Sequence, residues 1–167
     1  RRAAMYLITA ERMLAHDAPG RIDLYRRSLD TFDRAIALTG ENCERVTIPY
    51  GDGHLSGLLV KAQQTGGARS PLLVQVNGLD STKEMKYFVG LPTWLAQRGV
   101  SSLIVDQPGT GEALRLHGMH AVYNTEVWAS RIVDWLETRD DVDAKRIGME
   151  GVSLGGYGLS VRTEDIA

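Results

Sequence analysis

The residues most suited to covalent chemistry are 151–155, Gly-Val-Ser-Leu-Gly, in which two glycines flank a serine at a distance of two positions. A serine in a sharp strand-to-helix turn needs glycine at these positions, because side chains there would push the strand and the helix apart. Such a turn exposes the hydroxyl for attack on a carbonyl carbon, and the next backbone N–H faces the oxygen that becomes negative. We therefore predict that Ser153 is a nucleophile and that Leu154 supplies one oxyanion donor.

The alternative is a glycine-rich turn with an incidental serine, and the preceding element favours the nucleophile. Residues 146–150 are expected to form a short strand that runs directly into Gly151, which is the context that the motif requires.

A second oxyanion donor has to come from the loop after an earlier strand. Asn77, Gly78, Leu79 and Asp80 follow the apolar run 72–76. Glycine allows close approach of the backbone, so the Leu79 N–H is the expected donor, with the other three residues supporting the pocket. The alternative is an ordinary turn, because Asn-Gly is a strong turn pair.

Residues 106–112, Asp-Gln-Pro-Gly-Thr-Gly-Glu, follow another apolar run at 100–105. Their glycines suggest a dinucleotide loop, but that fingerprint requires glycine where Leu114 stands. We therefore expect no nucleotide cofactor. Asp106 and Glu112 are expected to accept backbone hydrogen bonds and to hold neighbouring loops together, and direct catalysis by Glu112 stays an alternative.

The remaining side chains that could ligate a metal or attack a substrate form no convincing group. His117 and His120 lie three residues apart with no carboxylate or cysteine ligand beside them, so surface or loop roles are expected and no metal site. The single cysteine, Cys43, excludes an internal disulfide and a CxxC site, and it is expected to be inert.

The elements that must position these residues fall into two parts. Residues 3–16 and 21–39 have helical spacing, and Ala3, Leu7, Ala10 and Leu14 are expected to form the buried face of the first helix. From residue 46 the apolar period changes to two, which predicts a β-hairpin. We expect a cap-like helical segment over 1–42 and an α/β core over 43–167.

Within that core, short expected strands alternate with helical stretches. The strands expected at 72–76, 100–105 and 146–150 are separated by a helical stretch that ends at Gly99 and by another that presents Trp128 and Ile132 on one face. This alternation is typical of an α/β fold with a mostly parallel sheet and crossover helices.

The composition excludes several other classes of protein. The 167 residues are 43% hydrophobic and 24% charged, and the net charge is −2. A near-neutral chain is not built to coat nucleic acid, and no apolar run approaches the length that crosses a bilayer. With no signal peptide in view, we expect a cytoplasmic protein that does not bind nucleic acid or membranes, and a homodimer is possible.

Taken together, the motifs resemble the α/β-hydrolase superfamily. More narrowly, they resemble the group that includes 2,6-dihydroxypseudooxynicotine hydrolase and the fermentation–respiration-switch-like esterases. The resemblance rests on residues 48–50, 77–84, 106–112 and 151–157. It implies a serine hydrolase with a Ser-Asp-His triad in that chain order, acting without a cofactor on a small acyl or ketone substrate. The bond cleaved would be an ester or a ketone-activated C–C bond.

The acid and the base that the resemblance implies do not follow Ser153. Residues 154–167 contain no histidine, and Asp165 falls where the helix after the serine, or its end, is expected. We expect this sequence to be the front part of a longer protein, so the sheet would be incomplete at its C-terminal end. The alternative is a non-catalytic relative that keeps the fold as a binding or regulatory module.

Overall fold

The computed structural model describes residues 1–63 and 65–160, and the chain divides into two compact units, Arg1–Cys43 and Glu44–Ala167. The first unit is a pair of contacting helices, α1 (Arg2–Arg12) and α2 (Arg21–Thr39). Glycines with positive φ, Gly20 and Gly40, stand at the two ends of α2, where the chain has to leave the helical path.

The buried face of α1 differs from the expected one by one residue. Ala4, Ile8 and Glu11 are fully buried, whereas Ala3 and Leu14 are exposed. The sequence pattern was misleading because a charged residue belongs to the buried face. The carboxylate of Glu11 lies 2.8 Å from the Arg21 guanidinium, and this ion pair compensates its burial.

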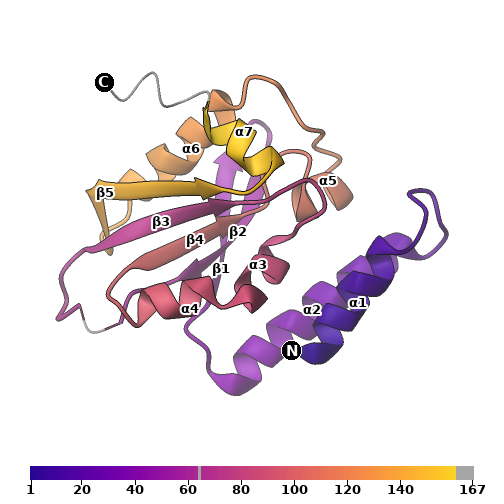
Figure 1. Ribbon diagram of the computed structural model, residues 1–167, viewed down its shortest axis with the longest axis horizontal. Coiled ribbons are helices and arrows are strands. Elements are labelled where there is room, and N and C mark those ends of the chain that lie inside the picture. The colour runs from indigo at the N-terminus through magenta and orange to yellow at the C-terminus, as the bar shows by residue number, and fades with distance from the viewer. Residues whose placement is uncertain (64, 161–167) are drawn as a thin grey trace. The chain divides into compact units, whose positions relative to one another are not determined.

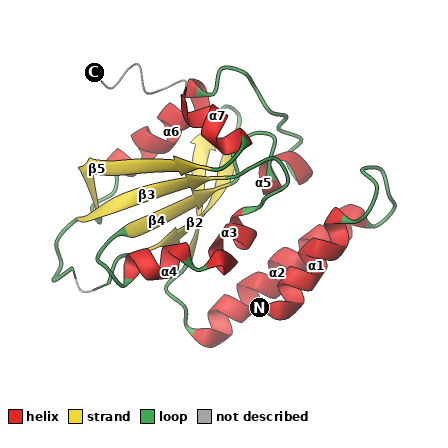
Figure 2. Ribbon diagram, in the orientation of Figure 1, coloured by secondary structure: helices red, strands yellow, loops and turns green. Residues whose placement is uncertain are grey.

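The second unit is a five-stranded sheet with the order β1-β2-β4-β3-β5 (Figures 1 and 2). Its strands are β1 (Glu44–Tyr50), β2 (Gly53–Val60), β3 (Ser70–Val76), β4 (Ser101–Val105) and β5 (Val142–Gly151). The first two form the predicted antiparallel hairpin, and β2 also pairs antiparallel with β4. The pairs β3–β4 and β3–β5 are parallel, so the predicted α/β fold class is confirmed.

One face of the sheet packs against α6 (Glu126–Glu137). The side chains on this face alternate along each strand, as Leu72, Val74 and Val76 do on β3, and they form one core with Trp128 and Ile132. Because buried parallel strands must be covered on both faces, the continuous apolar runs of β3 and β4 also require a layer on the opposite side.

Short helices supply contacts outside that core. The single helical stretch expected to end at Gly99 is two helices, α3 (Lys83–Val89) and α4 (Leu91–Ala96), both of which contact β2 and β4. The helix breaks at Gly90, whose φ is 91°, and Pro92 stands in the first turn of α4. A short helix, α5 (Gly111–Arg115), follows β4, and none of the helices in the described ranges is long and apolar enough to cross a membrane.

Candidate active site

Ser153 occupies a turn between β5 and α7 (Leu154–Ser160). Its φ is 56°, and it is the one non-glycine residue with positive φ in the described part of the chain. This left-handed conformation costs an ordinary residue on the order of 1–2 kcal/mol. Ser153 is exposed, and its carbonyl accepts a 2.9 Å hydrogen bond from the Gly156 N–H at the start of α7. The sequence therefore adopts the strained strand-to-helix turn that the motif predicts.

The glycines around Ser153 are required by packing. A Cβ atom on Gly151 would clash with the backbone of Gly155. A Cβ atom on Gly155 would lie 2.8 Å from the carbonyl oxygen of Asn77, which is closer than real Cβ atoms approach backbone. The end of β5, the start of α7 and the loop after β3 are thus in direct backbone contact.

Gly78 brings that loop to the serine. A Cβ atom built on Gly78 would lie 3.5 Å from the Ser153 Cβ and 3.2 Å from the Val152 carbonyl oxygen. The next residue, Leu79, is 62% exposed, and Asp80 is exposed beside it. Across the described residues, the N–H groups of Leu79 and Leu154 have no protein acceptor. Both amides are therefore available, and their assignment as an oxyanion hole stays a prediction.

Asn77 is buried and clamps the start of this loop to the segment after β4. Its backbone N–H donates to Gln107 Oε1 at 3.0 Å, and Gln107 Nε2 donates back to the Asn77 carbonyl at 2.6 Å. The Asn77 side chain donates to the Val105 carbonyl at 3.0 Å and to Asp106 Oδ1 at 2.7 Å. The predicted supporting role of Asn77 thus has a concrete geometry, in which it holds two strand ends together.

Asp106 is fully buried and accepts four hydrogen bonds. Besides that from Asn77, Oδ1 accepts the Lys83 N–H at 2.8 Å, while Oδ2 accepts Lys83 Nζ at 2.8 Å and the Glu112 N–H at 2.9 Å. All four partners are donors, so the ionised carboxylate is the form that satisfies them. A Cβ atom on Gly111 would clash with this carboxylate, which explains the glycine in the 106–112 motif.

Sequence reasoning missed the residue at the centre of this arrangement, Lys83. Its ammonium is fully buried and lies 2.8 Å from Asp106, 2.7 Å from Glu112 and 3.0 Å from Glu84. Arg45 of β1 adds a second cation, 3.1 Å from Glu112 and 3.5 Å from Glu84. We call these five residues, two cations and three carboxylates, the charge cluster.

Burial and pairing act in opposite directions on the pKa values in the charge cluster. Burial favours the neutral amine of Lys83, but the three carboxylates outweigh it and raise the pKa of Lys83 above its usual 10.5. Burial raises the pKa of Asp106, against the attraction of Lys83. Burial also opposes ionisation of Glu112, yet Lys83 and Arg45 prevail and lower its pKa. The cluster therefore depends on the charge of Lys83.

The histidines lie in other surroundings. The rings of His54 and His117 meet edge to face with centroids 4.8 Å apart, and His117 Nε2 lies 3.9 Å from Glu112 Oε1. None of the hydrogen bonds found among residues 1–63 and 65–160 joins a histidine to Ser153. Asp165, considered above, lies outside the described residues. The described residues also contain no group of three or more acidic, histidine or cysteine side chains able to hold a metal ion.

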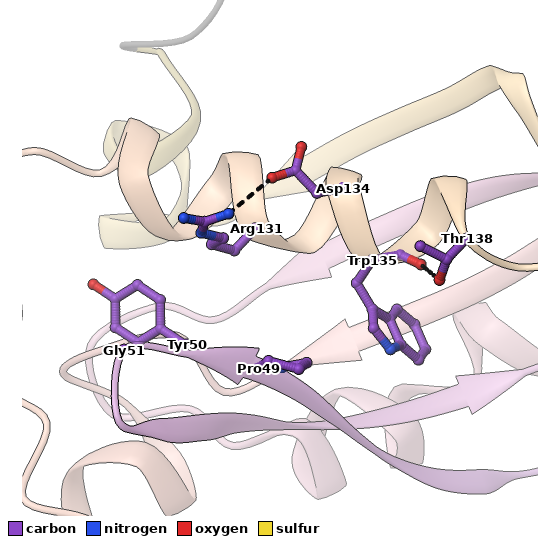
Figure 3. A pocket seen from close by; sticks show the side chains of 7 residues that line it. All are labelled: Pro49, Tyr50, Gly51, Arg131, Asp134, Trp135 and Thr138. Atoms are coloured by element: carbon purple, nitrogen blue, oxygen red, sulfur yellow. Dashed lines mark hydrogen bonds and ion pairs between the residues drawn. The ribbon is translucent and has the colours of Figure 1, made fainter.

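Two of the hollows lined by described residues lie beside α6. One of about 430 Å³ lies between the turn of the β1–β2 hairpin and α6, where Tyr50 and Trp135 face it and Arg131 pairs with Asp134 (Figure 3). The other, of about 40 Å³, is bordered by Trp128, Leu154 and Tyr157. Although it is smaller, the second hollow is the one that touches the turn of Ser153.

Comparison with known proteins identifies relatives of the chain, although no protein-family model matches it. An α/β hydrolase from a species of Acremonium, ucsC, is 32% identical over 81% of the chain and 31% of its own length. The hydrolase acrC of Aspergillus aculeatus is 33% identical over 93% of the chain and 41% of its length. The 20-hydroxy-prefusarin hydrolase FUS2 of Gibberella moniliformis is 32% identical over 96% of the chain and 40% of its length. The chain thus spans about a third to two fifths of these curated relatives.

Solved structures show the same fold. The crystal structure of 2,6-dihydroxy-pseudo-oxynicotine hydrolase superposes with a TM-score of 0.77 at 23% identity, covering 92% of the chain and 41% of that structure. AbyA5 superposes with a TM-score of 0.76 at 23% identity, covering 99% of the chain and 48% of its own.

Proposed function

Because the chain belongs to the α/β-hydrolase superfamily, we propose that the protein is a serine hydrolase in which Ser153 attacks the carbonyl carbon of an ester or of a ketone-activated C–C bond. The observation that carries the proposal is the Ser153 turn. A non-glycine residue is held at positive φ between β5 and α7 by contacts that only glycine permits, and this exposes its hydroxyl.

The backbone beside Ser153 supports a role in stabilising negative charge. Attack by the hydroxyl oxygen turns the substrate carbonyl into an oxyanion, and two N–H groups aimed at that oxygen lower the barrier. The N–H groups of Leu154 and Leu79 are the candidates, since one follows the serine and the other follows Gly78. Loss of one such donor typically slows turnover by about a hundredfold to a thousandfold.

Proton transfer requires a base, which we propose to be a histidine oriented by an aspartate, neither of them among residues 1–167. A serine hydroxyl is a weak nucleophile at neutral pH until a base takes its proton. In the proposed reaction, the histidine accepts the Ser153 proton and then gives it to the leaving alcohol or carbanion, and water hydrolyses the acyl-enzyme. The small hollow beside Leu154 and Tyr157 is a candidate subsite for a small apolar group of the substrate.

The test is substrate profiling of the full-length protein. We expect hydrolysis of p-nitrophenyl esters or cleavage of a 1,3-diketone, and the Ser153→Ala variant should lose at least about a thousandfold in kcat. Retention of a folded α/β unit with no turnover on either substrate class would favour the non-catalytic binding module instead.

A further inference from the structure

We propose that Lys83 is a positioning residue for the reaction at Ser153, acting through Asp106 on the loop 77–82; this inference rests on the proposed hydrolase function. Lys83 binds both oxygens of the Asp106 carboxylate, with its N–H on Oδ1 and its Nζ on Oδ2, each at 2.8 Å. The loop begins at Asn77, whose side chain donates to the same Oδ1 at 2.7 Å. One carboxylate therefore holds both ends of the loop.

The middle of that loop is the part that faces the serine. Gly78 lies against Val152 and Ser153, and the Gly78 carbonyl accepts the Ser81 N–H at 3.1 Å within the loop itself. Leu79 and Asp80 are exposed, so little side-chain packing holds them. The position of the Leu79 amide relative to Ser153 consequently depends on the two fixed ends. Asp106 accepts a hydrogen bond at each end, from the Lys83 N–H and from the Asn77 side chain. Asn77 is also held by its bonds to Gln107 and to the Val105 carbonyl.

The charge of Lys83 keeps Asp106 in place. Without the ammonium, three carboxylates from the start of α3, the end of β4 and α5 would face Arg45 alone. Uncompensated buried charges take up water or a proton, or move apart. Any of these responses shifts the Asp106 carboxylate, and a displacement of about 1 Å near reacting atoms can lower a rate by about a hundredfold.

The test uses the full-length protein with the double variant Lys83→Met/Glu84→Gln, which removes one cation and one anion and so leaves the formal charge of the cluster unchanged. The matched control is Lys86→Met. Lys86 lies on the same helix, and its Nζ pairs with Glu150 at 2.8 Å outside the cluster. Lys83→Arg, which keeps the charge, is the rescue variant.

We expect the double variant to stay folded and to lose about a hundredfold in kcat on p-nitrophenyl acetate, with KM changed by less than about threefold. The kcat of Lys86→Met should stay within about twofold of the parent value. The kcat of Lys83→Arg should be at least about tenfold higher than that of the double variant. A folded double variant with unchanged kcat, or a loss no larger than its unfolded fraction, would overturn the role of Lys83.

Hydrogen exchange separates this inference from the proposed function. The amides of Ser81 and Lys83, which donate to the Gly78 carbonyl and to Asp106, should exchange faster in the double variant than in the parent, while those of β3 stay protected, whether or not the protein turns over any ester. Unchanged exchange at these two amides contradicts the positioning role. An inactive parent with faster exchange in the variant contradicts only the hydrolase proposal.

Discussion

The turn of Ser153 and the charge cluster around Lys83 border the same loop, but opposite physical means hold them in place. The turn is built from backbone, since Ser153 has positive φ and Gly151 and Gly155 leave no room for side chains. The cluster is built from charged side chains, with Lys83 fully buried among three carboxylates. Added side-chain atoms should therefore destabilise the turn, and removal of a charge should destabilise the cluster.

The largest effect is expected from Asp106→Asn. The amide would turn an N–H₂ toward two of the four donors and leave Lys83 with one carboxylate fewer. We expect a loss of about 3–5 kcal/mol in the free energy of unfolding, measured by urea denaturation of the full-length protein. The control is Glu84→Gln, expected to lose less than Asp106→Asn, because Glu84 pairs with Lys83 at 3.0 Å but its oxygens accept no hydrogen bond from the described residues. Equal losses in the two variants would contradict this contrast.

The second effect concerns the turn. In Gly155→Ala the new methyl group would lie 2.8 Å from the Asn77 carbonyl oxygen and 3.0 Å from that of Val76, so the backbone has to move. The expected loss is about 2–3 kcal/mol in the same denaturation experiment. Gly156→Ala is the matched neighbour, with its nearest contact at 3.3 Å, and should lose less than about 1 kcal/mol. A tolerated Gly155→Ala would show that the turn is not packed as tightly as described.

The third effect is a pH dependence that belongs to the cluster. The pKa of Lys83 is raised in the folded protein, so its stabilisation is fully present below its ordinary pKa of 10.5 and is lost as the pH rises above it. We expect unfolding titrations to show an extra loss of about 1 kcal/mol per pH unit just above that value. Lys83→Met should lack this extra slope, and an identical slope in both proteins would argue against a charged, paired Lys83.

The smallest effect is a gain in stability at the turn. Ser153→Gly removes the side chain that makes positive φ unfavourable, so we expect the free energy of unfolding to rise by about 1 kcal/mol. Thermal denaturation measures this, with Ser153→Ala as the control, because alanine keeps the strain and should not share the gain. Equal stabilities for glycine and alanine at this position would mean that the turn stores no strain.

The sequence specified the turn better than the cluster because the turn is local. Its glycines stand two residues from Ser153, and a short strand was expected directly before it, so the strand-to-helix context was predictable. The parallel sheet and the hairpin followed from the same kind of short-range periodicity. The roles of Ser153, Leu79 and Leu154 in catalysis stay predictions.

The cluster was only half predictable because its members come from distant segments. Arg45 and Glu112 are 67 positions apart, and Lys83-Glu84 at a helix start has the pattern of an exposed first turn. Asp106 and Glu112 were expected to hold loops together. Asp106 accepts hydrogen bonds from Asn77 and Lys83, and the role of both carboxylates stays a prediction. The buried face of α1 was misassigned for a related reason, since its Glu11 is buried through an ion pair with distant Arg21.

The measurement that tests the central claim most directly is covalent labelling of the full-length protein with a fluorophosphonate, followed by mass spectrometry of its peptides. The phosphonate carries the phosphorus that an activated serine attacks, and it resembles the tetrahedral intermediate of acyl transfer. The account predicts one modified residue, Ser153, and no labelling after Ser153→Ala or after heat denaturation. Labelling at another serine, or none at Ser153 in a protein that hydrolyses esters, would contradict it.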